Sequence, residues 1–154
     1  NSYLFVPGSA FVREINTDTT RWDLHGGGAK IYRGGTIGGK YIRIPITIPS
    51  VLYGQPVRVT SLTVYYQSHN GANNYITDTT LYKNTDADSW DLLVSDAGDR
   101  TSNTATSYSI STDGATNTLS SGQGILSLLL DLEFSNDTDY ILITGVRLTL
   151  DHTP

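Results

Sequence analysis

The stretch Gly124–Phe134, GILSLLLDLEF, alternates apolar and polar side chains along most of its length. A period of two is typical of a β-strand that has one face on a core and one face toward solvent. Ser127, Asp131 and Glu133 occupy the solvent side of this pattern. The predicted core face carries Leu126, Leu128, Leu130, Leu132 and Phe134.

Tyr41–Ile48 repeats the pattern, with an isoleucine at every second position. Pro45 lies on its other face and lacks an N–H group, which predicts an edge strand or a bulge. Gly145 interrupts another alternating run and predicts a bulge there. Weaker strand patterns cover residues 11–15, 21–24, 29–32, 61–67, 76–82, 90–95, 106–111 and 140–150.

Glycine-centred turns separate these runs, and no stretch shows helical periodicity for more than about a turn. The pattern predicts an all-β protein, a single antiparallel β-sandwich of jelly-roll type with about ten short strands. A length of 154 residues suits one domain over 1–154.

Composition excludes several classes of function. The chain has no Cys, which excludes disulfides, thiolate metal sites and Cys nucleophiles. A net charge of −5 argues against nucleic-acid binding, and no apolar run is long enough for membrane insertion. Few Lys, no Met and many Thr, Ser and Tyr indicate an extracellular, cell-surface or virion location. A start at Asn1 is expected for a processed form or an excised domain.

The order of motifs resembles a group of bacterial and phage modules. Its elements are YIRIPITIP, VRVTSLTVYYQSHNG, TTLYK and GILSLLLDLEFSNDTDYILITGVRLTLD, preceded by a Pro-containing lead-in with a Gly-rich turn. The chain is similar to jelly-roll-like head modules of secreted or fibre-like proteins over nearly its whole length. The resemblance implies an assembly or recognition role and a trimer, and it implies no catalytic residues.

Asp86, Asp88 and Asp91 are the candidate metal ligands, because alternating oxygen ligands are typical of calcium loops. The segment lacks the glycine and the glutamate of an EF-hand. Two interpretations stay open here, a structural calcium ion and a solvated acidic turn. Similar acidic groups at Asp96 and at Asn136–Asp139 are expected to cap turns.

Catalytic groups are hard to assemble from this sequence. The three histidines adjoin turns or the terminus, and no strand–turn–helix elbow is present for a serine nucleophile. Glu14, Glu133 and the aspartates could supply a glycosidase pair, but Glu133 lies on the face predicted to be solvated. We therefore expect no enzyme, with a glycan hydrolase as the residual alternative.

One segment combines aromatic rings with amide groups, the combination that a sugar-binding site uses for ring stacking and hydroxyl recognition. Tyr65 and Tyr66 point to opposite faces of one strand, and either ring could instead cover a neighbouring strand or an interface. Trp22 and Trp90 are expected at the rim of the core. The candidate glycan-binding residues are Tyr66, Gln67, His69, Asn70, Asn73, Asn74 and Tyr75.

Two functions therefore remain in contention. The first is a non-catalytic structural module that self-associates in an extracellular fibre, coat or virion surface, since Lys residues that usually guard strand edges are scarce. The alternative is a carbohydrate-binding, lectin-like module for a neutral glycan, because the net negative charge repels anionic polymers.

Overall fold

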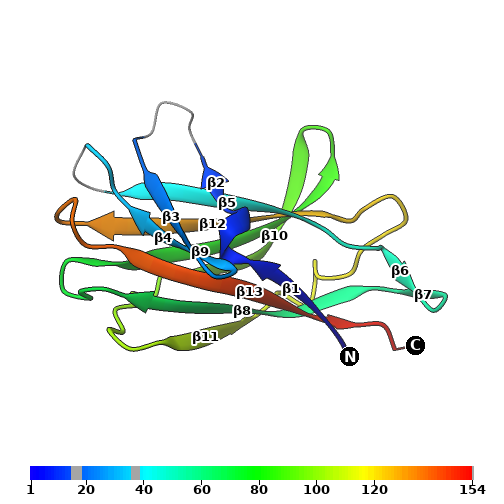
Figure 1. Ribbon diagram of the computed structural model, residues 1–154. Coiled ribbons are helices and arrows are strands. Elements are labelled where there is room, and N and C mark those ends of the chain that lie inside the picture. The colour runs from blue at the N-terminus through cyan, green and yellow to red at the C-terminus, as the bar shows by residue number, and fades with distance from the viewer. Residues whose placement is uncertain (15–18, 36–38, 154) are drawn as a thin grey trace.

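The computed structural model describes residues 1–14, 19–35 and 39–153, and within them two antiparallel sheets pack face to face (Figure 1). Sheet A has the strand order β11 (Thr106–Ser111), β8 (Arg58–Ser68), β13 (Ile141–Asp151), β4 (Gly28–Tyr32) and β3 (Arg21–His25). A further strand of sheet A, β1 (Ser2–Pro7), also pairs with β13 but lies outside this linear order.

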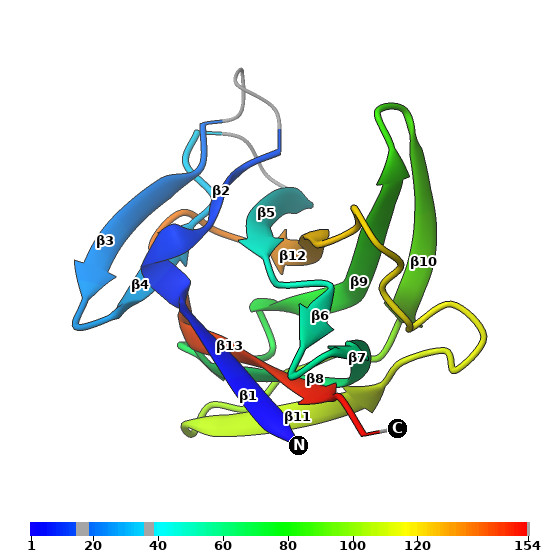
Figure 2. The ribbon, with the colours of Figure 1, turned by 90° about the vertical axis from the view of Figure 1, so that its right-hand side faces the viewer.

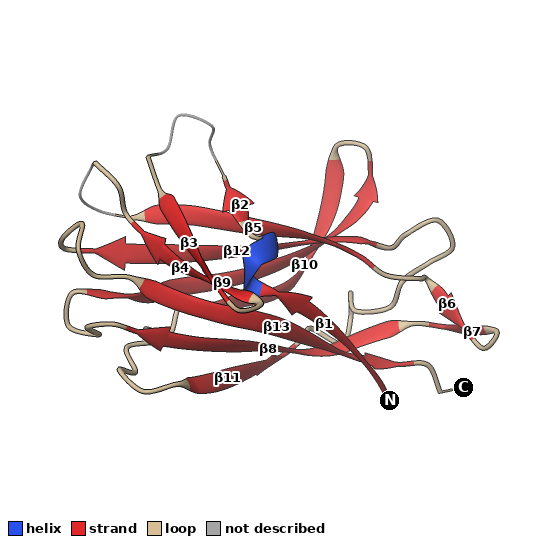
Figure 3. Ribbon diagram, viewed as in Figure 1, coloured by secondary structure: helices blue, strands red, loops and turns tan. Residues whose placement is uncertain are grey.

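Sheet B has the order β10 (Ser89–Asp96), β9 (Asn74–Asp86), β12 (Ile125–Phe134), β5 (Lys40–Thr47) and β2 (Val12–Arg13). A small ribbon joins β6 (Val51–Leu52) to β7 (Gln55–Pro56), and η1 (Gly8–Ala10) is a single 3-10 turn. Strands make up most of the described chain, as the red segments of Figure 3 show. The prediction of an all-β jelly-roll sandwich is confirmed.

The core lies between the two sheets and consists mainly of Ile, Leu and Val. The predicted core face of Gly124–Phe134 is confirmed, because its five members are fully buried: Leu126, Leu128, Leu130, Leu132 and Phe134. The isoleucines of the neighbouring strand β5 lie on the same face of the sheet and pair with Leu126, Leu128 and Leu130. Burial of these side chains supplies the main driving force for folding.

Each of the ten predicted strand regions contains a strand. The bulge at Gly145 is confirmed, since the pairing of β13 with β8 shifts register between Ile143 and Gly145. The short strand β2 pairs with Ile42 and Arg43 of β5 and does not extend to Pro45. On the side of β2, Pro45 therefore has no neighbouring strand among the described residues. Alternation did not predict β1, whose Leu4 and Val6 pack on the core while Tyr3 and Phe5 are also apolar and exposed.

Seen end-on, the outer side of sheet B lies between two raised walls (Figure 2). The hairpin of β9 and β10 rises on one side, and β2 and β3 lie on the other, with β5 and β12 between them. Among the described residues, we find no helix of the length and hydropathy required to span a bilayer.

Candidate functional site

The outer face of sheet B presents side chains in rows across β9, β12 and β5. In one row, Asp78 lies opposite Asp131, which lies opposite Tyr41 on its other side. Another row toward the β9–β10 turn joins Tyr82, Ser127 and Pro45. These rows follow from strand pairing, because directly opposed residues of an antiparallel sheet point to the same face.

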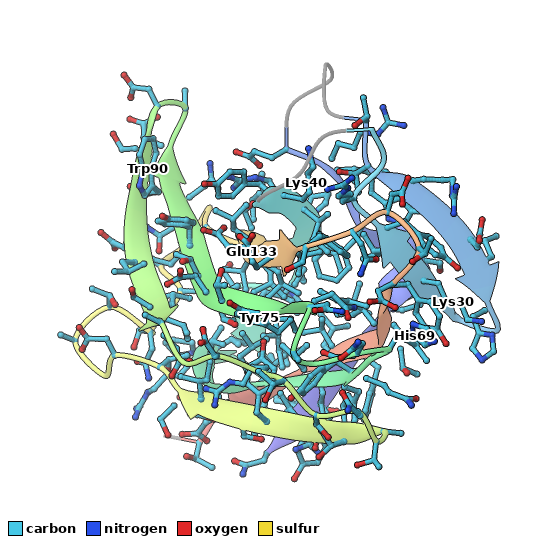
Figure 4. All side chains as sticks on the ribbon, turned by 90° about the vertical axis from the view of Figure 1, so that its left-hand side faces the viewer. Lys30, Lys40, His69, Tyr75, Trp90 and Glu133 are labelled. Atoms are coloured by element: carbon cyan, nitrogen blue, oxygen red, sulfur yellow. The ribbon has the colours of Figure 1, made fainter. Side chains whose placement is uncertain are left out.

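Trp90 and Tyr82 form the most prominent aromatic feature of this face. Trp90 is 61% exposed, and the centroid of its ring lies 6.3 Å from that of Tyr82 in an edge-to-face arrangement. Figure 4 shows Trp90 high on the β9–β10 hairpin, with Glu133 and Tyr75 nearer the centre of the end view. A large exposed indole is uncommon on a monomeric surface and is typical of a binding site.

A hollow of about 230 Å³ lies beside these rings. It is lined by Arg43, Tyr82, Asn84, Trp90 and Ser127. The lining therefore combines two rings with a guanidinium, an amide and a hydroxyl group. Apolar walls with a few fixed polar groups are the usual composition of a small-molecule site.

The guanidinium of Arg43 is held by two partners. Its Nε donates to Glu14 Oε2 at 2.5 Å and its Nη2 donates to Glu14 Oε1 at 2.7 Å, while Nη1 donates to Ser127 Oγ at 2.6 Å. The hydrogen bond from Arg43 lowers the pKa of Glu14. Arg43 therefore enters the hollow in a fixed orientation, because a bidentate carboxylate pair restrains the guanidinium plane.

Asp131 and Asp78 lie farther along the same face. Burial raises the pKa of Asp131 to about 6, and the negative charges of Asp78 and Glu14 add to the shift. An acidic group with a pKa raised in this way on an exposed sheet face is a candidate for a functional role.

The predicted glycan-binding residues lie mostly at the β8–β9 connection, on another part of the molecule. The ring of Tyr66 is in the core, and its hydroxyl accepts from the N–H of Ser102 at 3.3 Å. Gln67 Nε2 donates to the carbonyl of Asn103 at 2.8 Å. Tyr75 is half-buried on sheet B, where it lies opposite Glu133.

The asparagines of this connection are engaged within it. The side-chain Oδ1 of Asn70 accepts from Ala72 N–H. The buried Asn74 donates from Nδ2 to the carbonyl of Tyr140 and accepts at Oδ1 from the N–H of Asn70. Asn73 Nδ2 donates to Asp139 Oδ2 at 3.3 Å. These amide groups stabilise the turn, and a glycan-binding role for them stays a prediction.

His69 is the exposed member of this group. Its Nδ1 lies 2.6 Å from Asp139 Oδ1, and its ring stacks on Tyr140 at 4.6 Å. Hydrogen bonds from Asn136, His69 and Asn73 lower the pKa of Asp139. Asn136 also accepts from the N–H groups of Thr138 and Asp139, so the expected turn cap is confirmed. In Figure 4, His69 lies beside Lys30, well away from Trp90.

The structure does not gather the three predicted metal ligands. Asp86 caps the N–H of Ala87, and Asp88 accepts from Ser89 Oγ. Asp91 instead lies 3.2 Å from Nζ of Lys83, a buried lysine that also donates to the carbonyls of Thr116 and Thr118. In residues 1–14, 19–35 and 39–153, no three His, Asp or Glu side chains converge to hold an ion.

Sequence reasoning missed the Trp90 hollow. Trp22 packs on the core as expected, whereas the expectation for Trp90 is wrong because its ring projects from the sheet. The faces of Tyr41, Arg43 and Asp131 were recognisable from alternation, but their strands are far apart in the chain. The available signal was weak: each of two successive strand patterns carries an aromatic residue, Tyr82 and Trp90, but alternation groups Trp90 with the apolar Leu92 and Val94.

Comparison with solved structures returns carbohydrate-binding modules. TmCBM27, a module described by its specific mannan recognition, matches with a TM-score of 0.54 and 11% identity over 99% of this chain and 100% of its own. The CBM36-1 domain of a multidomain xylanase, from the hindgut metagenome of Trinervitermes trinervoides, gives 0.53 and 10% over 96% and 97%. CBM86 of Roseburia intestinalis, a low-affinity xylan-binding module, gives 0.50 and 12% over 98% and 97%.

At such identities the likeness establishes the fold alone. No protein-family profile and no curated protein matches the sequence. The chain has the jelly-roll β-sandwich fold that these carbohydrate-binding modules share.

Proposed function

We propose that this protein is a non-catalytic carbohydrate-binding module whose ligand lies on the outer face of sheet B. The observation that carries the proposal is the exposed Trp90 ring beside Tyr82, over a hollow lined by Arg43, Asn84 and Ser127. Aromatic rings stack on the apolar faces of sugars, and the polar groups bind hydroxyls. The solved structures with a similar fold also favour a carbohydrate-binding function over an assembly role.

The face is long enough for an oligosaccharide. Tyr41 and Tyr82 are separated by two interstrand spacings and by four residues along the strands, which places their Cα atoms about 16 Å apart. A glycan chain that stacks on Trp90 and Tyr82 therefore reaches the row of Asp78, Asp131 and Tyr41. A secreted, extracellular location belongs to the same proposal.

Affinity electrophoresis against neutral plant polysaccharides tests this site. Trp90→Ala should weaken binding by about tenfold or more, because truncation of a central aromatic anchor usually costs more than about 1.4 kcal/mol. Phe5→Ala is the matched control, since Phe5 is 65% exposed, similar to Trp90, but lies on β1 of sheet A. Equal losses in both variants, or unchanged binding in Trp90→Ala, would place the ligand elsewhere.

Self-association remains the second candidate function, and one observation favours it. Tyr3 and Phe5 are 57% and 65% exposed on β1, which pairs only with β13 among the described strands. An apolar row on an edge strand is a common contact between copies of a chain.

A further inference from the structure

Asp78 faces Asp131 only because β9 contains a bulge. Asp131 pairs with Asp78, but the next residue of β12, Leu132, pairs with Ile76, so Thr77 is an extra residue in β9. Ile76 is in the core, and strict alternation would turn Asp78 toward the core as well. The bulge instead turns Asp78 outward, and Thr77 Oγ1 donates to the carbonyl of Asp131 at 3.3 Å. Bulges often re-aim a side chain at a functional site.

The two carboxyl groups therefore oppose each other at close range. Directly opposed Cβ atoms in an antiparallel pair are about 5 Å apart. Neither carboxylate forms a hydrogen bond or an ion pair within the described residues through its side-chain oxygens, so both are available to a ligand. Like charges opposed in this way are unfavourable, and this arrangement needs a compensating role or a shared proton.

The surrounding groups do not neutralise the pair. On β12 the next outward acid is Glu133, and β5 contributes Tyr41 and Arg43. The guanidinium of Arg43 is already bonded to Glu14, and β9 adds Tyr75 and Tyr82. The outward residues of β10 beside them, Trp90 and Leu92, are uncharged. The face thus holds four carboxyl groups and a single guanidinium among its described residues.

This arrangement has two consequences for a ligand. A polymer that carries uronate groups meets uncompensated negative charge at the middle of the face. A neutral glycan offers hydroxyls that a carboxylate accepts, and a protonated Asp131 could also donate to the ring or hydroxyl oxygens. Covering the pair with sugar removes water from it, which favours uptake of a proton because burial disfavours the charged form. Since the pKa of Asp131 is already raised to about 6, that proton is taken up in mildly acidic solution.

We propose that Asp78 and Asp131 make the sheet B face selective for uncharged glycans over polyuronates, and that glycan binding tightens as the pair takes up a proton. The proposal rests on the carbohydrate-binding function proposed above. It assigns the selectivity to one cross-strand pair and not to the net charge of the protein.

The experiment measures retardation of the protein in gels that contain a neutral mannan, a neutral xylan or polygalacturonate, at pH 5 and at pH 8. The variants are Asp131→Asn and Asp78→Asn, with Asp137→Asn as the control. Asp137 is exposed in the β12–β13 connection, so its substitution changes the net charge equally without altering the pair. Thermal melting at both pH values confirms that each variant is folded.

We expect wild-type protein to bind a neutral glycan up to about tenfold more tightly at pH 5 than at pH 8, since one unit of pKa change on binding corresponds to a factor of ten. Asp131→Asn should bind at pH 8 as wild type does at pH 5, without pH dependence. At pH 8, polygalacturonate should bind measurably only to the two pair variants, and Asp137→Asn should behave as wild type.

Each other outcome has a distinct meaning. Neutral-glycan binding that depends on Trp90 but has the same pH profile in wild type and Asp131→Asn would overturn this inference and leave the proposed function intact. Polygalacturonate binding by wild type at pH 8 as tight as neutral-glycan binding would also overturn it. A lack of retardation in every gel would overturn both. Titration of the Asp131 carboxyl group by carbon-13 NMR, which should give a higher pKa with glycan present, is a second measurement independent of the variants.

Discussion

Asp131 retains a carboxyl group at a position where the fold opposes its ionisation. Its pKa is raised from 3.8 to about 6, first by burial and then by Asp78 and Glu14. The folded state therefore binds a proton more tightly than the unfolded chain does. The resulting stabilisation is fully present below pH 3.8 and is lost as the pH rises through about 6. A charge kept at such a cost is common at binding sites.

The corresponding substitution, Asp131→Asn, should stabilise the protein at pH 8 and leave its stability nearly unchanged at pH 4. The full pKa shift would be worth about 3 kcal/mol, and solvent screening of this half-buried group reduces it to on the order of 1 kcal/mol. Urea unfolding at both pH values measures the difference. A variant less stable than wild type at pH 8 would contradict the assigned electrostatic strain.

At the scale of the element, β12 is the central strand of sheet B and contributes a row of fully buried side chains to the core. Leu130 is fully buried at its centre, between Ile42 of β5 and Thr79 of β9. Leu130→Ala should lower the free energy of unfolding by about 2 to 5 kcal/mol, because it removes apolar burial and leaves a cavity. Chemical denaturation monitored by tryptophan fluorescence checks this value. A loss below about 0.5 kcal/mol, as at a surface position, would mean that the register of β12 is wrong.

The junction between η1 and β13 has little space for a side chain. A Cβ atom at Gly8 would lie 1.8 Å from the carbonyl oxygen of Ile143, a backbone atom that cannot move without shifting β13. Gly8→Ala should therefore destabilise the protein by about 1 to 3 kcal/mol, the usual range for overpacking. Gly114→Ala is the control, since its Cβ would meet no atom within 4 Å. Equal melting temperatures for the two variants would argue against this close approach.

At the scale of the whole molecule, the two outer faces differ in chemistry. Sheet B carries the Trp90 hollow and the acidic pair, whereas β1 of sheet A exposes Tyr3 and Phe5. If the protein self-associates, as the shortage of Lys and the resemblance to fibre heads predict, light scattering should give a multiple of the chain mass, with a trimer expected. Phe5→Ala should then lower that mass while Trp90→Ala leaves it unchanged. A monomer at high micromolar concentration for wild type would contradict the assembly prediction.

The sequence alone was sufficient for the strands that show a clear alternation and for their inner faces. Alternation is a local property, so Leu126 to Phe134 and the isoleucines of Tyr41–Ile48 reveal their buried side without knowledge of any partner. Short pairs such as β6 and β7 carry too few residues to show a period. In β1 the outward residues are as apolar as the inward ones, and the alternation disappears.

The candidate site was decided by the tertiary structure, because strand pairing joins residues that are distant in the chain. Tyr41, Asp78 and Asp131 belong to three separate segments, and only the order β9, β12 and β5 places them in one row. The orientation of Asp78 depends further on a bulge that arises where β9 meets β12. The exposure of Trp90 likewise follows from its position on the β9–β10 hairpin (Figure 4), since a tryptophan in a strand pattern carries no mark of which face will remain uncovered.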